Sequence, residues 1–130
     1  YLNDLEEYAR EQGILDAVTK NRLAQLKADC EVARLLHYRV TWMQGKGMVP
    51  NYESAMSKMY GFELLQRVGE FGMEMAGQYG QLAEGSERAP MYGRIPSCYL
   101  RSFGHSLEQG TSEIDRDVVA QRGLGLPRLR

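Results

Sequence analysis

Residues 108–112 hold the side chains of this chain that are best suited to chemistry. The run reads Glu-Gln-Gly-Thr-Ser, so a carboxylate and a carboxamide precede a glycine and two hydroxyls. The carboxylate of Glu108 can accept a proton, whereas the amide of Gln109 is not basic at any working pH. The Gly110-Thr111-Ser112 turn predicts the start of a helix, whose N-terminus favours anions. The hydroxyl of Thr111 can therefore serve an anion or simply cap that helix.

The other reactive residue types predict no metal site. His37 and His105 are 68 positions apart, with no acidic or cysteine partner at metal-ligand spacing. Cys30 and Cys98 fit no CxxC pattern, and we interpret both as free thiols in a reducing compartment. The sequence contains no glycine-rich phosphate loop, no Ser-His-Asp pattern and no basic-aromatic patch for nucleic acid.

The composition is that of an ordinary globular domain. The chain has 130 residues, of which 43% are hydrophobic and 25% charged, so it suits one domain with one core. Its formal net charge of −1 does not indicate nucleic-acid binding. No apolar run approaches the roughly 18 residues of a membrane span. No signal peptide is visible, and we expect the true N-terminus to lie upstream of Tyr1.

Hydrophobic periodicity predicts helices and no strand. A first helix ends at Gly13, and Asp16 can cap a second, long helix. An apolar stripe extends along this second helix for about six turns, until Gly45, Gly47 and Pro50 end it. A face this wide predicts contact with more than one neighbour. The stripe comprises Leu23, Leu26, Cys30, Ala33, Leu36, Val40 and Met43, with Val32, Leu35 and Trp42 widening it on one side.

A third helix is predicted to begin near Asn51. Glycine is unfavourable inside a helix, so Gly61, Gly69 and Gly72 indicate either tight helix–helix contact or poor local propensity that packing tolerates. Further glycines end this helix and open the one long irregular connection, over residues 81–98. The apolar face of the third helix comprises Met59, Phe62, Leu65, Val68, Gly72 and Met75.

Two shorter helices are predicted in the last third of the chain, one from Ser97 to Phe103 and one after Gly110. In the second, Ser112-x-x-Asp115 resembles a capping box. Together the elements predict an all-α, antiparallel up-and-down bundle with two long central helices, forming a single domain over residues 1–130. The last helix is expected to bury Ile114, Val118 and Val119, to end at Gly123, Gly125 and Pro127, and to leave a basic tail with Arg128 and Arg130.

Several segments resemble the C-terminal helical domain of acyl-CoA dehydrogenases, the flavoenzymes that desaturate acyl-CoA thioesters. Residues 22–26 and 31–39 resemble the first long helix of that domain, residues 54–58 the start of the next helix, and residues 75–80 its glycine-containing end. Residues 108–128 resemble the closing motif, with Gly-Thr-Ser-Glu-Ile followed by Arg and a Gly-Leu-Gly-Leu-Pro-Arg ending. The resemblance covers nearly the whole chain in the right order, and the closing motif is its most specific part.

This resemblance implies a C-terminal fragment of a longer, FAD-dependent flavoprotein, without its N-terminal helical and middle β domains. The fragment would form a wall of the acyl-CoA and flavin site and would build a dimer or tetramer. The parent would pass electrons to an electron-transfer flavoprotein in a bacterial cytoplasm, and the isolated fragment would be inactive. The alternative is a non-catalytic structural subunit or assembly module of a hetero-oligomeric acyl-CoA dehydrogenase.

The position of the catalytic base departs from the family pattern. In the best-known members of the family, the residue before Gly-Thr is a glutamate that removes the α-proton while a hydride leaves the β-carbon for the flavin, whereas some members place the base on the preceding helix. Gln109 stands at this position and is not competent as a base. Three explanations stay open: an upstream base on the preceding helix, a hetero-oligomer whose partner supplies the complete site, or substitution by Glu108 through a local bulge. Taken alone, Glu108 is interpreted as an exposed carboxylate near a helix start.

The resemblance also implies flavin contacts. In the family, the end of the third helix reaches the diphosphate or adenosine portion of a neighbouring subunit's flavin, and the matching positions are Glu74, Gly77 and Gln78. The family often has glutamine where Glu74 stands, and a carboxylate near a diphosphate would be repelled. In the closing motif, Thr111 and Glu113 match positions that contact the cofactor.

Overall fold

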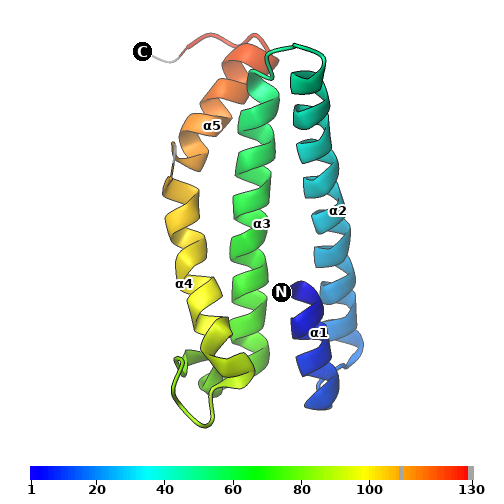
Figure 1. Ribbon diagram of the computed structural model, residues 1–130, viewed down its shortest axis with the longest axis vertical. Helices are drawn as coiled ribbons and strands as arrows, with labels where there is room; N and C mark the ends of the chain where they lie inside the picture. The colour runs from blue at the N-terminus through cyan, green and yellow to red at the C-terminus, as the bar shows by residue number, and fades with distance from the viewer. Residues whose placement is uncertain (109, 129–130) are drawn as a thin grey trace.

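A computed structural model describes residues 1–108 and 110–128. Gln109 and Arg130, which the sequence singled out, lie outside the described residues. The described part of the chain is helical and contains no strand, as the periodicity predicted. Five α-helices are labelled in Figure 1: α1 (Leu2–Glu11), α2 (Ala17–Gly45), α3 (Tyr52–Ala76), α4 (Arg94–Leu107) and α5 (Ser112–Val118). The described residues also form three short helical segments: η1 (Gly77–Gln81), η2 (Pro90–Gly93) and the π-type η3 (Val119–Gly123).

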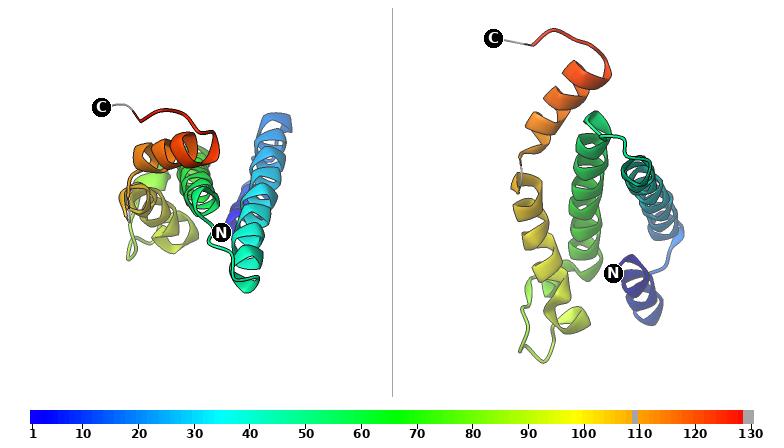
Figure 2. Two further views of the ribbon diagram at one scale, coloured as in Figure 1. Left: turned by 90° about the horizontal axis from the view of Figure 1, so that it is seen from above. Right: turned by 45° about the horizontal axis from the view of Figure 1, so that its top comes forward.

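Helix α3 lies at the centre of an antiparallel up-and-down arrangement. Helix α2 runs up one side of it, whereas α4 and α5 lie end to end along the other side (Figures 1 and 2). Helix α1 packs beside the lower ends of α2 and α3 (Figure 1). The all-α bundle is therefore confirmed, but only one of the two long helices is central. Helix α2 is lateral because it packs along α3 on one side only.

The boundaries of α1 and α2 follow the local signals of the sequence. Gly13 adopts a left-handed backbone with a φ of 68° after α1. The carboxylate of Asp16 accepts a hydrogen bond from the backbone N–H of Thr19 at 2.7 Å, which confirms the predicted cap. The apolar stripe of α2 is buried only near its ends, and its widened side faces solvent. The buried members are Leu23, Leu26 and Met43, and the exposed ones are Val32, Leu35 and Trp42.

Helix α3 supplies most of the core. Val68 and Gly72 of the predicted face are buried, and the other predicted members are half-buried. Leu64 and Phe71, which the predicted face omits, are also buried. The reason is that α3 packs against α2 on one side and against α4 and α5 on the other, so it buries two faces rather than one.

Two of the three interior glycines of α3 mark close helix contacts. A Cβ at Gly69 would lie 3.0 Å from the Cα of Tyr99 on α4. A Cβ at Gly72 would lie 3.1 Å from the hydroxyl of Tyr1 and 3.3 Å from a methyl of Leu5. At Gly61, nothing would lie within 4 Å. Tight contact therefore explains Gly69 and Gly72 and does not explain Gly61.

Helix α4 is longer than the predicted segment from Ser97 to Phe103. It begins at Arg94 and ends at Leu107, because Pro96 falls in its first turn, where a missing N–H breaks no intrahelical bond. The irregular connection before it is correspondingly shorter. This connection ends at Gly93, whose φ is 77°. A side chain at this position would clash with the backbone of Glu84.

Helix α5 begins after Thr111, whose hydroxyl accepts from the backbone N–H of Ile114 at 3.5 Å. The predicted capping box of Ser112 and Asp115 is therefore wrong. The carboxylate of Asp115 instead turns inward, where Lys58 of α3 neutralises it. Ile114, predicted to face inward, is 55% exposed as a consequence, whereas Val118 and Val119 are half-buried.

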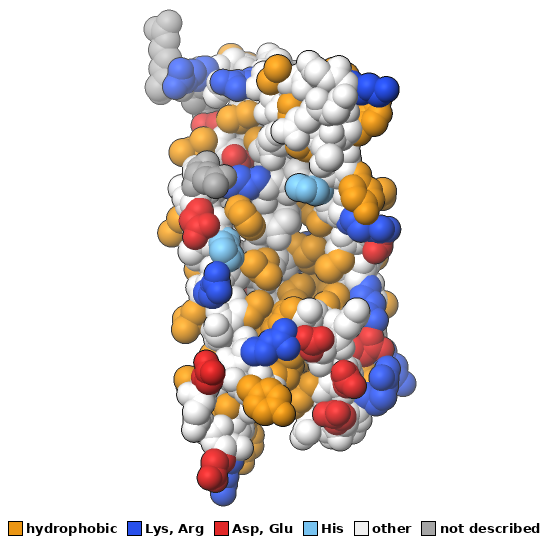
Figure 3. Space-filling model, viewed as in Figure 1, with side chains coloured by type: hydrophobic (Ala, Val, Ile, Leu, Met, Phe, Trp, Pro, Cys, Tyr) orange, Lys and Arg blue, Asp and Glu red, His pale blue; other side chains and the backbone are white. Residues whose placement is uncertain are grey.

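The fold leaves a large apolar surface uncovered. The total accessible area of the chain, polar and apolar together, is 8786 Å², against about 7,000 Å² expected for a folded monomer of this mass. Hydrophobic side chains gather in the middle of the face shown in Figure 3, between charged flanks. On α2, the side chains of Leu35, Tyr38 and Trp42 are more than half exposed. Among the described residues, no helix is both long and apolar enough to cross a membrane.

Candidate functional site

The turn between α4 and α5 is tied to the N-terminal third of α3. The ammonium group of Lys58 donates to the carbonyl of Gly110 at 2.5 Å and to the carboxylate of Asp115 at 2.7 Å. The side chains of Lys58 and Asp115 are only 17% and 10% exposed, so water screens this ion pair poorly. Neither residue was singled out from the sequence for this role, because the contact joins positions more than fifty residues apart.

A row of side chains leads from Lys58 to Glu108. The ammonium of Lys58 lies 5.6 Å from the ring centroid of Phe62, and that ring stacks on His105 with centroids 5.6 Å apart. Nδ1 of His105 lies 3.2 Å from a carboxylate oxygen of Glu108. Glu108 directly follows α4 and its side chain is 62% exposed. Glu108 is thus an exposed carboxylate at the end of α4 rather than in the first turn of α5.

Thr111 and Glu113 lie together at the start of α5. Because the Thr111 hydroxyl and the backbone N–H of Glu113 stabilise the carboxylate, the pKa of Glu113 is below its usual range. Glu113 is exposed and lies in the first turn of α5. The α4–α5 turn therefore presents a hydroxyl and an ionised carboxylate to its surroundings.

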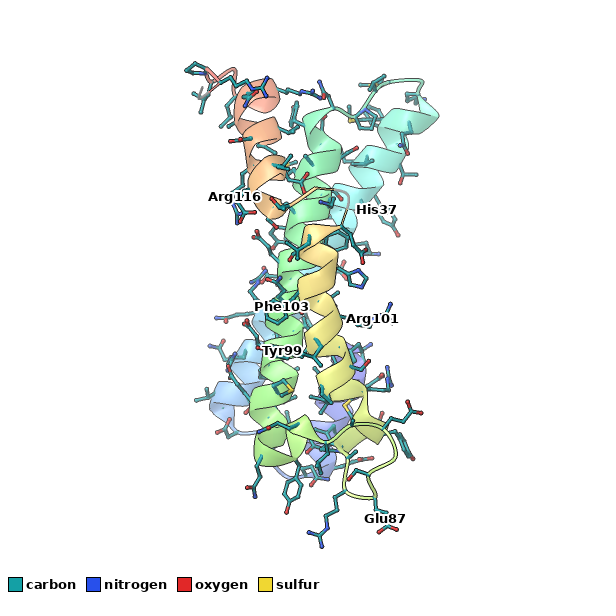
Figure 4. The ribbon with its side chains drawn as sticks, turned by 90° about the vertical axis from the view of Figure 1, so that its left-hand side faces the viewer. His37, Glu87, Tyr99, Arg101, Phe103 and Arg116 are labelled. Atoms are coloured by element: carbon teal, nitrogen blue, oxygen red, sulfur yellow. The ribbon has the colours of Figure 1, made fainter. Side chains whose placement is uncertain are left out.

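Two hollows lie on opposite sides of the bundle, one beside the α4–α5 turn and one along α4 toward α1. The first has a volume of about 430 Å³ and a charged lining that includes Glu63, Arg116 and Glu113. The second, of about 290 Å³, lies between α3 and α4 and is lined by Leu65, Arg101 and His105 among others. Arg116 and Arg101 project to opposite sides of the bundle in Figure 4. The second hollow combines apolar and cationic side chains, and the Arg116–Glu63 ion pair forms part of the wall of the first.

The end of α3 forms a separate polar group. The carboxylate of Glu74 pairs with the guanidinium of Arg22 from α2, and this carboxylate raises the pKa of Arg22. Gly77 has a φ of 55°, and both Gly77 and Gln78 are exposed. Arg22 also lies over the ring of Phe71, at 4.9 Å from its centroid. Arg22 was not singled out from the sequence, since its pairing with Glu74 depends on the packing of α2 on α3.

The predicted site residues form two groups that this chain does not bring together. Lys58 contacts the α4–α5 turn, and Glu74 lies sixteen residues further along the same helix. At 1.5 Å per residue, the two groups are about 24 Å apart. Gln109 lies outside the described residues. Over the described ranges, 1–108 and 110–128, no cluster of three or more His, Cys, Asp or Glu side chains could hold a metal ion.

Residues 7–124 match the family described as acyl-CoA dehydrogenase, C-terminal domain. The chain belongs to the acyl-CoA dehydrogenase family. The predicted family is thereby confirmed, and its members are flavin-dependent oxidoreductases. Among curated relatives, acyl-CoA dehydrogenase FadE26 of Mycobacterium tuberculosis is 30% identical over 113 residues, covering 82% of this chain and 27% of that protein. Acyl-CoA dehydrogenase IpdE1 of the same organism is 26% identical over 128 residues, covering 98% of this chain and 32% of that protein.

Solved acyl-CoA dehydrogenase structures share this helical fold. The Tcur3481-Tcur3483 steroid ACAD superimposes with a TM-score of 0.91 at 26% identity, over 98% of this chain and 34% of that chain. A chain of the ChsE4-ChsE5 complex from Mycobacterium tuberculosis gives a TM-score of 0.88 at 26% identity, over 98% of this chain and 35% of that chain. This chain therefore spans only about a third or less of the length of these relatives.

Proposed function

We propose that this chain is the C-terminal domain of a longer flavoprotein that desaturates acyl-CoA thioesters between the α and β carbons. The observation that carries the proposal is the family match over residues 7–124, which includes the α4–α5 turn that Lys58 anchors to α3. An N-terminal helical domain and a middle β domain would complete the protein. The excess accessible surface supports the proposal, because a domain cut from its partners exposes the area that they would cover.

The end of α3 would contact the diphosphate or adenosine portion of FAD bound mainly by a neighbouring subunit. The described residues fit such a group. Arg22 supplies a guanidinium that offsets the repulsion between Glu74 and phosphate, and Gln78 supplies an exposed amide donor. Gly77 presents backbone without a side chain. When bound, FAD would accept the hydride from the β-carbon of the thioester.

The α4–α5 turn would face the flavin and the thioester. Thr111 and Glu113 would contact the cofactor through a hydroxyl and a carboxylate, and Leu65 and His105 would line the acyl-CoA side of the turn. The distance of about 24 Å between this turn and Glu74 is compatible with the proposal that the two groups serve different flavins in an oligomer.

The direction of α1 supports an upstream catalytic base. Helices α1 and α3 run the same way, and Tyr1 and Leu5 lie against Gly72 (Figure 1). Lys58 is fourteen residues before Gly72 on α3. If α1 continues upstream as a helix, a residue about fourteen positions before Tyr1 would lie level with Lys58 and the turn, because both helices rise by the same amount per residue. A glutamate there would remove the α-proton in place of Gln109.

A structural subunit of a hetero-oligomer is the alternative that the comparisons favour. Two of the similar structures carry paired names, Tcur3481-Tcur3483 and ChsE4-ChsE5, and the second is described as a complex. The exposed apolar side of α2 offers a surface for such a partner. In this case, the partner would supply the complete site and this chain would supply its wall. Substitution by Glu108 is the weakest explanation, since its carboxylate is exposed and pairs with His105.

Anaerobic titration of the full-length protein tests the proposal. The purified protein, without partners, is mixed with straight-chain, branched and steroid-side-chain acyl-CoA thioesters while the flavin absorbance is recorded. Bleaching would support an independent dehydrogenase with its own base. Retained absorbance, with bleaching restored by a co-purified related chain, would support the structural subunit. Retained absorbance under both conditions would contradict both proposals.

Two variants separate the remaining explanations of the base. Glu108→Gln abolishes bleaching only if Glu108 is the base, whereas substitution of an upstream glutamate abolishes it only if the base lies on the extension of α1. The isolated 130-residue chain serves as the negative control, since the proposed flavin-binding domains are missing from it. The proposed physiological acceptor is an electron-transfer flavoprotein in a bacterial cytoplasm. Added to the bleached enzyme, this acceptor would reoxidise its flavin.

A further inference from the structure

We infer that Lys58 is a positioning residue, which holds the α4–α5 turn at a set place against α3. This inference rests on the proposed function, because it assigns the placement of the turn that would face the flavin and the thioester. Lys58 is the only side chain of the described residues that hydrogen-bonds both a carbonyl of the turn and a carboxylate of α5.

The chemistry of an ammonium group suits this role. It offers three donors, and two of them reach the Gly110 carbonyl and the Asp115 carboxylate. Its stem lies beside Phe62, with the charge 5.6 Å from the ring centroid. An apolar residue would pack in the same space and would hold neither acceptor.

A second ion pair between the same helices provides a comparison. Arg116 of α5 donates to Glu63 of α3 at 2.5 Å, but their side chains are 54% and 35% exposed. Exposed pairs of this kind are screened by water and contribute little. The side chains of Lys58 and Asp115 are only 17% and 10% exposed. Because water screens their attraction less, this pair restricts the turn more strongly than the exposed pair does.

The consequence for the site is geometric. Gly110 follows the family base position directly and precedes Thr111, so the restraint on its carbonyl acts on both neighbours. Proton and hydride transfer require the reacting groups at near-contact distances, and small misplacements lower the rate without lowering affinity. Loss of the restraint should therefore slow flavin reduction more than it weakens thioester binding.

Double replacement tests the inference without leaving a buried charge. In the full-length protein, Lys58→Met with Asp115→Leu removes both charges and preserves apolar packing. Hydrogen–deuterium exchange followed by mass spectrometry measures the amides of residues 110–115, with those of α2 as an internal reference. Stopped-flow absorbance measures the flavin reduction rate at saturating thioester, and titration gives the thioester dissociation constant.

We expect the double variant to exchange the amides of residues 110–115 at least tenfold faster, with α2 unchanged. Flavin reduction should slow at least tenfold, with a thioester dissociation constant within twofold of the parent. We expect the conservative Lys58→Arg to retain slow exchange, because a guanidinium keeps the positive charge and offers five N–H donors to the two acceptors. The matched pair Glu63→Gln with Arg116→Met should leave the exchange of residues 110–115 unchanged, since that pair is exposed.

Parental exchange in the double variant would overturn the inference, as would faster exchange with an unchanged reduction rate. Should the double variant not fold, Lys58→Met with Asp115→Asn removes both charges, keeps a side chain of the original size at position 115 and gives the same comparison. A parent whose flavin is reduced by none of the thioesters, with or without a co-purified related chain, would contradict the proposed function alone. The exchange measurement would then still decide whether Lys58 holds the turn.

Discussion

Gly69 of α3 lies directly against the backbone of Tyr99 on α4, where an added Cβ would be 3.0 Å from the Tyr99 Cα. Backbone cannot give way as a flexible side chain can. We therefore expect Gly69→Ala to destabilise the protein by about 1–3 kcal/mol, because overpacking forces the helices apart. Urea denaturation measures this change, which should appear in the midpoint and not in the slope.

Gly61→Ala is the matched control on the same helix. Nothing lies within 4 Å of its added Cβ, so the higher helix propensity of alanine should stabilise the protein by up to about 1 kcal/mol. Equal effects of the two substitutions would contradict the contact between Gly69 and Tyr99.

Asp16 should make the stability depend on pH. The backbone N–H of Thr19 holds the pKa of Asp16 below its usual range in the folded state. The folded protein thus binds this proton less readily than the unfolded chain does. Its stabilisation is present above the ordinary pKa of about 4 and is lost as the pH falls through the lower folded pKa.

Asp16→Asn isolates this contribution, because asparagine caps a helix equally well and does not titrate. Thermal denaturation between about pH 5 and pH 2.5 should show a smaller fall in Tm for the variant than for the parent. Parallel curves for the two proteins would show that Asp16 does not contribute to the acid sensitivity.

Arg22→Met should weaken FAD binding in the full-length protein. This change removes the guanidinium that pairs with Glu74 and leaves the carboxylate next to the proposed diphosphate. Repulsion between the uncompensated carboxylate and the diphosphate predicts an FAD dissociation constant about tenfold higher. Fluorescence titration of the apoprotein with FAD measures it.

Glu74→Gln is the opposite test at the same position. It restores the residue that the family often has and removes the repulsion, so FAD should bind at least as tightly as it does to the parent. Unchanged FAD affinity in both variants would show that the end of α3 does not contact the flavin.

The exposed side of α2 should carry a subunit contact. Leu35→Glu with Trp42→Glu places two charges among side chains that are more than half exposed. Because an exposed apolar patch of this kind marks an interface, we expect a smaller assembly in light scattering of the full-length protein. Asn21→Glu with Ala24→Glu adds the same charge elsewhere on the exposed surface of α2 and should leave the assembly intact.

Gln109→Glu should create a base at the family position. If the parent lacks its own base, anaerobic flavin reduction by a thioester should appear where the parent shows none, because a carboxylate accepts the α-proton and an amide does not. If an upstream glutamate serves as the base, a second carboxylate nearby should change the pH profile of reduction instead. An unaltered rate and an unaltered profile would place position 109 away from the reacting carbon.

The sequence alone determined what depends on neighbouring residues. The 3.6-residue period of α2, the Asp16 cap and the left-handed turn at Gly13 are local, since each involves atoms only a few residues apart. The closing motif could also be recognised from the sequence, because the residues of the motif are contiguous. This motif indicated the family. Gln109 at the base position needed no structure to be recognised.

Only the tertiary structure decided which faces are buried and which polar groups meet. Helix α3 has neighbours on both sides, so its core includes Leu64 and Phe71 outside the single predicted face. The pairing of Lys58 with Asp115 and of Arg22 with Glu74 joins residues more than fifty positions apart. Such contacts depend on how helices pack, and a periodic pattern specifies a face but not the neighbour that covers it.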